Sequence, residues 1–337
     1  MRVAVLGAGS WGTALAMLLA GNGHSTMLWA HRPEAAETLE RERCNERYLP
    51  GIPFPDKLHV TADLEGAVAA ADVVLVVVPS HAFRETLHHL RPVVRPDHRI
   101  AWGTKGLEPE TRKLLHQVVR EELGETIPMA VVSGPTFARE VARKLPGAVT
   151  VAANDPDFAL ELARALHNDH FRAYTGDDIV GVELGGAVKN VMAIAAGTAD
   201  GMGFGAKARA ALIARGLSEM QRLGRALGAH DETFTGLTGL GDLVLTCTDD
   251  QSRNRRLGLA LGQGKGIDET VREIGQVVEG VGTCREVHEL ARDLNVEMPI
   301  TEQVYLIIHK GHTPQEAVQA LMMRAIRPEV EDRDRLS

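Results

Sequence analysis

One lysine, Lys189, lies inside an otherwise apolar stretch of the chain, residues 184–197. If this stretch is helical, Gly185 and Gly186 lie one turn before the lysine and Ala193 one turn after it, so the lysine's face carries little bulk. Such a face predicts close approach by another molecule. Because burial disfavours an ammonium ion, the amine is a candidate proton donor and acceptor near neutral pH. A packed helix whose lysine extends to solvent is the alternative.

Two polar groups in the second half of the chain could act beside this lysine. A single carboxylate, Asp242, lies in the glycine-rich segment 238–243, which we expect to form a turn. The segment 252–256 then gathers a serine, an asparagine and three arginines at a predicted helix start. A guanidinium, an amide, a hydroxyl and backbone N–H groups within one turn suit a monoester phosphate. An arginine-rich surface turn in contact with solvent is the alternative.

The amino-terminal residues predict a nucleotide site. Arg2–Leu6 is typical of a strand and Thr13–Ala20 of a helix. Between them lie Gly7, Gly9 and Gly12 in the spacing G-x-G-x-x-G. The first glycine permits a tight turn, the second lets the backbone approach a pyrophosphate, and the third lets the helix pack on the strand. With the N–H groups of the helix start facing a phosphate, this context predicts a dinucleotide site.

The end of the second predicted strand, Ser25–Ala30, bears on the choice of cofactor. A site for NAD usually has an acidic residue there to bind the ribose 2′-hydroxyl. This chain has His31 and Arg32 instead. A cation in that place favours the 2′-phosphate of NADP(H), and NAD(H) stays compatible. A solvated His–Arg pair in a loop is the alternative.

These residues need a scaffold that brings distant segments together, and the pattern predicts an α/β fold with a doubly wound, mostly parallel sheet. Ligands of such sheets lie beyond the carboxyl ends of the strands, so the loops 79–81, 103–106 and 133–138 are expected to line the site. Lys105 is placed in the crevice by this topology alone. The further strands are predicted at His59–Thr61, Val73–Val78, Arg99–Trp102, Met129–Ser133 and Ala148–Ala152, with a helix at Pro109–Leu123.

After Asp178, a candidate helix N-cap, the pattern becomes helical. We therefore expect a dinucleotide-binding domain over residues 1–178, a helical substrate-binding domain over 179–327, and a charged tail over 328–337. The predicted helices are Ile179–Ala196, Ala206–Leu227, Arg255–Leu261, Ile267–Ile274, Gly282–Asp293, Glu302–Ile308 and Pro314–Met323.

Composition limits the partners. The chain has 337 residues, 44% of them hydrophobic, and a formal charge of -8. That charge argues against nucleic acid or an anionic membrane as the main partner, since both need a broad basic face. Three cysteines without a C-x-x-C pair give no zinc site, and they suit the reducing cytoplasm. We expect no apolar run to reach the ~20 residues that a membrane span requires.

Several motifs together resemble the bacterial NAD(P)-dependent glycerol-3-phosphate dehydrogenase family, and the resemblance covers nearly the whole chain. The motifs are GAGSWG, GTKGLE, SGPTFA, LGGAVKNV, TGLTGLGDL, SRNRR and VEGVGT. The resemblance implies a Rossmann domain followed by a helical domain like that of 6-phosphogluconate dehydrogenases. It also implies reversible hydride transfer between NAD(P)H and dihydroxyacetone phosphate, which gives sn-glycerol 3-phosphate for phospholipid synthesis.

The resemblance also assigns roles to individual residues. Lys189 takes the family's proton-acceptor position. The substrate contacts it implies, besides that lysine, are Lys105, Gly134, Thr136, Asp242, Ser252, Arg253 and Asn254. The cofactor contacts, apart from the three glycines, are Ser10, Trp11, His31, Arg32, Tyr48, Lys105, Ala138, Arg253, Val277 and Glu279. Asp242 is expected to orient the amine of Lys189 or a substrate hydroxyl, and Lys105 to lower the proton affinity of that amine.

Two rival interpretations stay open at this point. A β-hydroxy-acid dehydrogenase of the same architecture would also use a lysine followed by an asparagine on a helix between domains, although residues 252–256 offer more donors than one carboxylate needs. A non-catalytic NADP-binding sensor would need the first domain but neither Lys189 nor Asp242. The sequence does not decide between a monomer and a homodimer.

Overall fold

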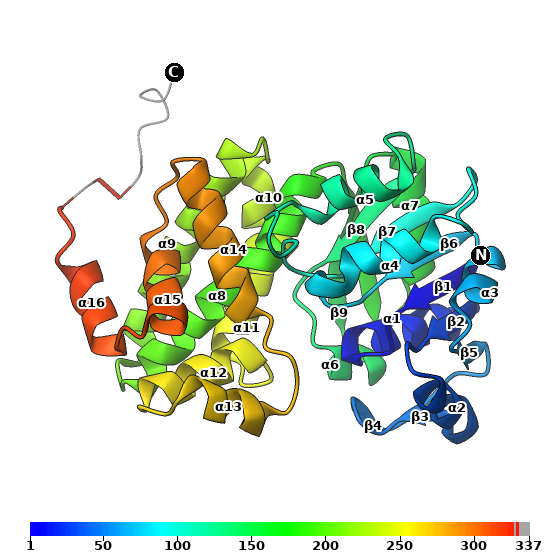
Figure 1. Cartoon of the computed structure of the whole chain (residues 1–337), viewed down its shortest axis with the longest axis horizontal. Coiled ribbons are helices and arrows are strands. Elements are labelled where there is room, and N and C mark those ends of the chain that lie inside the picture. Colours follow the sequence, from blue (N-terminus) through cyan, green and yellow to red (C-terminus); the bar gives the residue numbers. More distant parts are fainter. Residues whose placement is uncertain (327, 330–337) are drawn as a thin grey trace.

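The computed structural model of the chain describes residues 1–326, 328 and 329. A sheet with helices on both faces forms one half, and a bundle of helices forms the other (Figure 1). Helix α8, which begins at Ile179 directly after the last strand, joins the halves. Asp178 caps this helix by accepting a hydrogen bond from the Gly181 N–H, as expected from the sequence.

The sheet has eight strands in the order β10-β9-β8-β7-β6-β1-β2-β5. Of its neighbouring pairs only β8 and β9 are antiparallel, which confirms the predicted mostly parallel sheet. The strands β3 and β4 form a separate antiparallel pair. The bounds are β1 Arg2–Leu6, β2 Ser25–Trp29, β3 Cys44–Asn45, β4 Leu49–Pro53, β5 Leu58–Thr61, β6 Val73–Val76, β7 Arg99–Trp102, β8 Met129–Ser133, β9 Gly147–Ala153 and β10 Phe171–Gly176.

Each face of the sheet has its own core, because successive side chains of a strand point to opposite faces. In β1, Val3 and Val5 join one buried cluster, and Ala4 and Leu6 join the other. Helices cover both faces, which a parallel sheet requires. The helices of this half are α1 Ser10–Gly21, α2 Pro33–Glu42, α3 Leu64–Ala69, α4 Phe83–Leu90, α5 Leu115–Leu123, α6 Ala138–Ala142 and α7 Pro156–Leu166, with the 3-10 turn η1 Ser80–Ala82.

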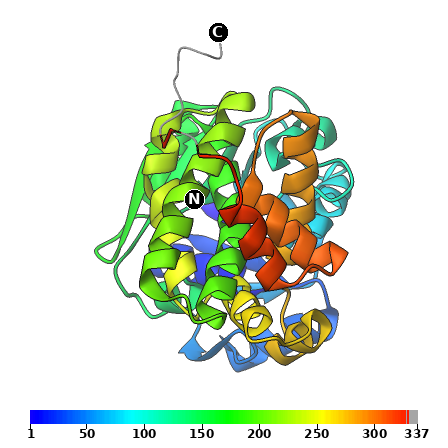
Figure 2. The same cartoon turned by 90° about the vertical axis from the view of Figure 1, so that its left-hand side faces the viewer.

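The other half is built around α8, whose side chains are nearly all buried. Figure 2 shows α15 and α16 at the end of the molecule, in front of the sheet. All seven helices predicted for this half are confirmed, with ends that differ by a few residues. The elements are α8 Ile179–Gly201, α9 Gly205–Ala226, α10 Asp231–Thr235, the π-helix η2 Leu237–Gly241, α11 Asp242–Thr248, α12 Arg253–Gly262, α13 Ile267–Ile274, α14 Gly280–Asp293, α15 Pro299–Lys310 and α16 Pro314–Met322.

Helices α8 and α12 pack at backbone contact. Glycines 197 and 201 of α8 face α12, and glycines 258 and 262 of α12 face α8. A Cβ atom at any of these four positions would lie 2.1 or 2.2 Å from a carbonyl oxygen of the partner helix, closer than packed atoms approach. The absence of a side chain at these positions therefore sets the distance between the two helices.

The structure corrects two predictions of local structure. The helix predicted at 109–123 begins only at Leu115, because Glu110 and Arg112 have left-handed backbone conformations, with φ of 69° and 59°. Strand β10 was not predicted, since its polar and half-exposed residues lack a buried strand's apolar run. The predicted tail, 328–337, lies outside the described residues except for 328 and 329.

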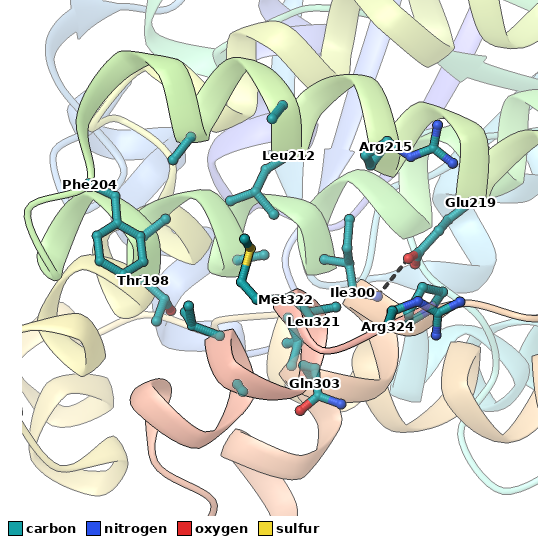
Figure 3. A pocket seen from close by; sticks show the side chains of 18 of the residues that line it. Thr198, Phe204, Leu212, Arg215, Glu219, Ile300, Gln303, Leu321, Met322 and Arg324 are labelled. Atoms are coloured by element: carbon teal, nitrogen blue, oxygen red, sulfur yellow. Dashed lines mark hydrogen bonds between the residues drawn. The ribbon is translucent and has the colours of Figure 1, made fainter. Parts of the chain in front are cut away.

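A cavity of about 1530 Å³ lies within the helical half, between α8, α9, α15 and α16 (Figure 3). Apolar side chains such as Leu212 and Leu321 line most of it. At one end the buried carboxylate of Glu219 accepts a hydrogen bond of 2.6 Å from the Ile300 N–H. This contact satisfies backbone donors at the start of α15, where side-chain capping is otherwise missing.

Helix α8 is also the one described helix that is long and apolar enough to cross a membrane. The sequence prediction that no such stretch exists is wrong for this helix by length and composition. However, 89% of its most apolar window is buried inside the protein. Helix α8 is therefore accounted for as a core helix.

Candidate active site

Lys189 lies in the middle of α8 and is 6% exposed. The small residues on its face were expected to admit another molecule, but the protein's own backbone occupies part of that space. A Cβ atom on Gly185 would lie 2.3 Å from the carbonyl oxygen of Thr238, and one on Gly186 would lie 3.5 Å from the stem of Lys105. The glycines thus bring the segment before Asp242 and the second lysine against the helix.

Asp242 is completely buried and accepts from both lysines. Its Oδ1 lies 2.6 Å from Lys189 Nζ, and its Oδ2 lies 2.7 Å from Lys105 Nζ. The turn predicted around this residue is wrong in detail, since the π-helix η2 leads directly into α11, of which Asp242 is the first residue. Such wide helical turns often occur at functional sites. Here the turn directs a carboxylate at two ammonium groups from different halves of the chain.

Lys105 reaches this carboxylate from the loop after β7. The loop is held at its start by Thr104, whose buried hydroxyl donates to the Val78 carbonyl at 2.7 Å. Lys105 Nζ also lies 3.4 Å from the carbonyl oxygen of Gly134, which follows β8. The Thr136 hydroxyl donates to the same carbonyl at 3.3 Å. Lys105 therefore meets Asp242 at the carboxyl ends of neighbouring parallel strands, as the predicted topology requires.

The surroundings of Lys189 favour the neutral form of its amine more than water does for a free lysine. Burial, opposed by Asp242 and assisted by the repulsion of Lys105, lowers the pKa of Lys189 to about 8. Burial acts to raise the pKa of Asp242, but the two ammonium groups outweigh it and hold that pKa below its usual range. Asp242 is thus a carboxylate at neutral pH, and Lys189 is poised to exchange its proton.

Two further polar residues at this site were not predicted. Thr246 lies one turn after Asp242 on α11, and its hydroxyl oxygen lies 3.1 Å from Lys189 Nζ while it donates to the Asp242 carbonyl at 2.6 Å. Asn190, buried beside the lysine, accepts from the Asn254 amide at 3.0 Å. The i, i+4 spacing of Asp242 and Thr246 was the signal that could have found the threonine.

The segment 252–254 forms the start of α12, as predicted, but several of its polar atoms are already engaged. Ser252 caps the helix by accepting from the Arg255 N–H. Arg253 Nη1 donates to the Val277 carbonyl at 2.7 Å. The side-chain oxygen of Asn254 accepts from the Gly280 N–H at 2.9 Å. The structure thus joins α12, α8 and the start of α14 through one buried network.

The predicted glycine-rich turn and the pair His31 and Arg32 lie at the carboxyl ends of β1 and β2. Gly7 has φ of 120°, and a Cβ atom there would lie 2.5 Å from the Val77 carbonyl oxygen. A Cβ atom on Gly9, by contrast, would have no described atom within 4 Å apart from its own neighbours along the chain. Gly9 is also the N-cap of α1 and has no side chain to cap it. The backbone at the start of α1 is therefore open at Gly9, as close approach by a pyrophosphate would require.

The other predicted cofactor residues come from several elements of both halves. His31 and Arg32 are exposed after β2, and the His31 ring contacts Trp29 edge-on with centroids 5.7 Å apart. Trp11, the second residue of α1, has a buried indole nitrogen without a partner in the described structure. The remaining positions are Ser10 at the start of α1, Tyr48 between β3 and β4, Ala138 at the start of α6, and Val277 and Glu279 before α14.

One residue near the turn was missed by sequence reasoning. Asn45 is buried, and its amide donates to the Ala8 carbonyl at 3.1 Å and to the Thr13 hydroxyl at 2.9 Å. It holds the glycine-rich turn in place from a distant segment. No local pattern around Asn45 indicates this contact.

Comparison with known families identifies both halves of the chain. Residues 2–159 match the sequence model described as the NAD-dependent glycerol-3-phosphate dehydrogenase N-terminus, and residues 178–319 match that of its C-terminus. The chain belongs to this family. The predicted resemblance is therefore confirmed.

Individual relatives agree with this membership. The chain is 59% identical over 330 residues to a glycerol-3-phosphate dehydrogenase [NAD(P)+] of Aeromonas salmonicida, covering 98% of this chain and 99% of the relative. The glycerol-3-phosphate dehydrogenase structure from Coxiella burnetii superposes with a TM-score of 0.93 at 50% identity, covering 96% and 99% of the two chains. The yeast glycerol-3-phosphate dehydrogenase has a TM-score of 0.84 at 29% identity, over 95% and 99%.

Proposed function

We propose that the chain is an NAD(P)H-dependent glycerol-3-phosphate dehydrogenase. It catalyses reversible hydride transfer between NAD(P)H and dihydroxyacetone phosphate, and the product, sn-glycerol 3-phosphate, serves phospholipid synthesis. The observation that carries the proposal is the buried group of Lys189, Asp242 and Lys105 in a member of this family. The rival interpretation, a β-hydroxy-acid dehydrogenase, has no comparable support.

The residues of the chain supply the proton and the geometry of the reaction. When bound, the nicotinamide cofactor supplies or accepts the hydride. Lys189 donates a proton to the developing alkoxide during reduction and accepts one during oxidation, which its lowered pKa favours. Asp242 holds the amine 2.6 Å away and offsets the charge of both lysines. Lys105 stabilises negative charge on the substrate oxygen from the other side.

The substrate's phosphate is proposed to bind at the start of α12. Arg253 supplies the charge there, Ser252 and Asn254 supply polar contacts, and Gly134 and Thr136 complete the site from the loop after β8. The buried network that joins Asn254 to Asn190, the neighbour of Lys189, supports this arrangement because it ties the two ends of the site together. The phosphate would thereby hold the distant carbonyl beside the amine.

The cofactor is proposed to lie across the carboxyl ends of β1 and β2. Its proposed protein contacts are Gly7, Gly9, Ser10, Trp11, Gly12, His31, Arg32, Tyr48, Lys105, Ala138, Arg253, Val277 and Glu279. Both NADP(H) and NAD(H) fit the relatives named for NAD(P)+, and the exposed cation pair after β2 supports a preference for NADP(H). We further propose residues 1–178 and 179–327 as the two domains, and the cytoplasm as the location.

One assay tests the proposal. The purified protein should oxidise NADPH and NADH with dihydroxyacetone phosphate, and much more slowly with unphosphorylated dihydroxyacetone or with small β-keto acids. Replacing Arg253 by alanine should raise KM for the phosphorylated ketone by roughly tenfold or more and also lower kcat, because the phosphate positions the carbonyl. Equal turnover of dihydroxyacetone and its phosphate would contradict the proposed phosphate site. Preferential turnover of a β-keto acid would favour the rival interpretation, a β-hydroxy-acid dehydrogenase.

A further inference from the structure

The segment 103–114, called here the Lys105 loop, belongs to both halves of the molecule. It connects β7 to α5, two elements of the sheet half. However, Leu107 and Leu114 are buried in the core of the helical half, in the same cluster as Val287 and Ala291 of α14. The loop therefore carries Lys105 from the sheet half into contact with the helical half.

The outer end of the Lys105 loop is fastened to α14 by one arginine. Arg112 Nη1 donates to Glu289 Oε2 at 3.1 Å, and Arg112 Nη2 lies 2.9 Å from Asp293 Oδ2. The two carboxylates lie one turn apart on α14. The left-handed conformation of Arg112 is uncommon for a residue with a side chain and persists only where the surroundings enforce it. The two ion pairs are such an enforcement.

Hydrogen bonds inside the loop connect Arg112 to the segment beside Lys105. The Arg112 N–H donates to the Glu108 carbonyl at 3.0 Å, and the Glu108 N–H donates to the Lys113 carbonyl at 3.0 Å. The Glu108 carboxylate accepts from the Thr111 hydroxyl and from Arg84. Residues 108–113 thus form a closed unit, and a displacement of Arg112 moves the whole unit.

The short connection between this unit and Lys105 also lies against α14. A Cβ atom on Gly106 would lie 3.2 Å from the Ser80 side chain and 3.5 Å from the hydroxyl of Thr283, which belongs to α14. The chain therefore lies close to α14 at both ends of the closed unit. Helix α14 acts as the surface on which the loop is seated.

We propose that Arg112 is a positioning residue, which fixes the Lys105 loop on α14 and so sets the place of the Lys105 ammonium beside Asp242 and Lys189. The inference rests on the proposed function, in which Lys105 contacts the substrate. Arg112 acts through the loop, and it contacts α14 shortly before α5 begins at Leu115.

The pH dependence of the reaction reports the place of Lys105. The charged and titratable groups around Lys189 are Lys105 from the loop, Asp242 and Cys247 from α11, and Glu279 at the start of α14. If Lys105 withdraws, Lys189 loses a repelling neighbour and keeps Asp242 to itself. Both changes favour the ammonium form, so the midpoint for glycerol 3-phosphate oxidation moves to higher pH.

The test compares Arg112→Ala with Arg225→Ala, which removes an arginine that pairs with Asp231 away from the loop. Arg112→Ala should raise KM for dihydroxyacetone phosphate by roughly three- to tenfold, the range set by two partly exposed ion pairs. Its pH midpoint should rise by about half a unit or more. Arg225→Ala should leave both unchanged. The double variant Arg112→Glu/Glu289→Lys should have a KM and a pH midpoint closer to those of the wild type than Arg112→Glu alone has.

Hydrogen exchange keeps this test independent of the substrate. In Arg112→Ala, amides of residues 103–108 should exchange faster, while those of α1 and β1 should exchange as in the wild type. If the wild type failed to turn over the proposed substrate, the proposed function would fail and the exchange result would still decide the positioning. Unchanged exchange at 103–108, or an unchanged pH midpoint and KM in an active enzyme, would overturn the role of Arg112.

Discussion

Replacement of Lys189 by methionine should remove the proton donor while keeping the apolar stem of the side chain. The variant should fold, because Lys105 still lies 2.7 Å from Asp242 and keeps that buried carboxylate paired. In the wild type the pKa of Lys189 falls from 10.5 to about 8. At ~1.4 kcal/mol per pKa unit, this change corresponds to roughly 3 kcal/mol in favour of the neutral amine.

This pKa change has a direct effect on the amount of available base. At pH 7 a lysine with the ordinary pKa is neutral in about 0.03% of molecules, and one with a pKa near 8 in about 10%. Oxidation of glycerol 3-phosphate by the wild type should therefore rise with pH through a single ionisation near 8. Reduction of dihydroxyacetone phosphate, which needs the ammonium form, should fall through the same ionisation.

The assay follows the absorbance of the reduced cofactor from about pH 6 to about pH 10, a range that brackets the ionisation. Lys189→Met should lower kcat by at least about a hundredfold, raise KM less, and show no ionisation near 8. Lys265→Met, which removes an exposed lysine paired with Glu273, serves as the control and should behave as the wild type. A Lys189→Met protein with most of its kcat and an unchanged pH profile would refute the reasoning, and Lys105 would become the candidate.

Three other changes test separate parts of the structure. Arg32→Ala should raise KM for NADPH about tenfold or more and leave KM for NADH nearly unchanged, since a charge-assisted contact to phosphate contributes ~1.5–3 kcal/mol; equal losses for both cofactors would remove the 2′-phosphate assignment. Burial raises the pKa of Glu286 from 4.5 to about 7. The contribution of this group to stability is therefore complete below pH 4.5 and is lost as the pH rises through about 7. The free energy of unfolding of the wild type, measured with denaturant, should therefore fall over this pH range by ~3 kcal/mol relative to that of Glu286→Gln. The exposed control Glu302→Gln should follow the wild type. Gly258→Ala should lower the free energy of unfolding by ~1–3 kcal/mol or more, because its Cβ would lie 2.1 Å from a carbonyl oxygen of α8, and Gly266→Ala, with open space around its Cβ, should not.

The sheet and the helical half could be predicted from the sequence because their signals are local. Alternating strands and helices, the glycine spacing after β1 and the helical period after Asp178 each lie within one short window. The mostly parallel sheet and the place of Lys105 at the carboxyl ends of its strands then followed from rules that hold for parallel sheets in general. Strand β10 escaped because its half-exposed residues give no apolar run.

The detail of the site depends on contacts between distant segments, which a local pattern does not contain. That Asp242 is shared by two lysines follows from the packing of the Lys105 loop, η2 and α8 against one another. The network of Asn190 and Asn254 joins residues 64 positions apart. Left-handed conformations at Glu110 and Arg112 replaced a predicted helical turn, because ion pairs with α14 and hydrogen bonds within the loop outweigh local helix preference.

The backbone contact between α8 and α12 bears on how substrate size can evolve. Lys189 lies on α8 and the proposed phosphate donors lie at the start of α12. The distance between these two helices therefore determines the length of the substrate that fits between them. That distance is set by the glycines at positions 197, 201, 258 and 262, whose only side-chain atom is hydrogen. An enzyme of this architecture that accepts a longer phosphorylated ketone should carry alanine or serine at one or more of these four positions, even with every polar residue of the site retained.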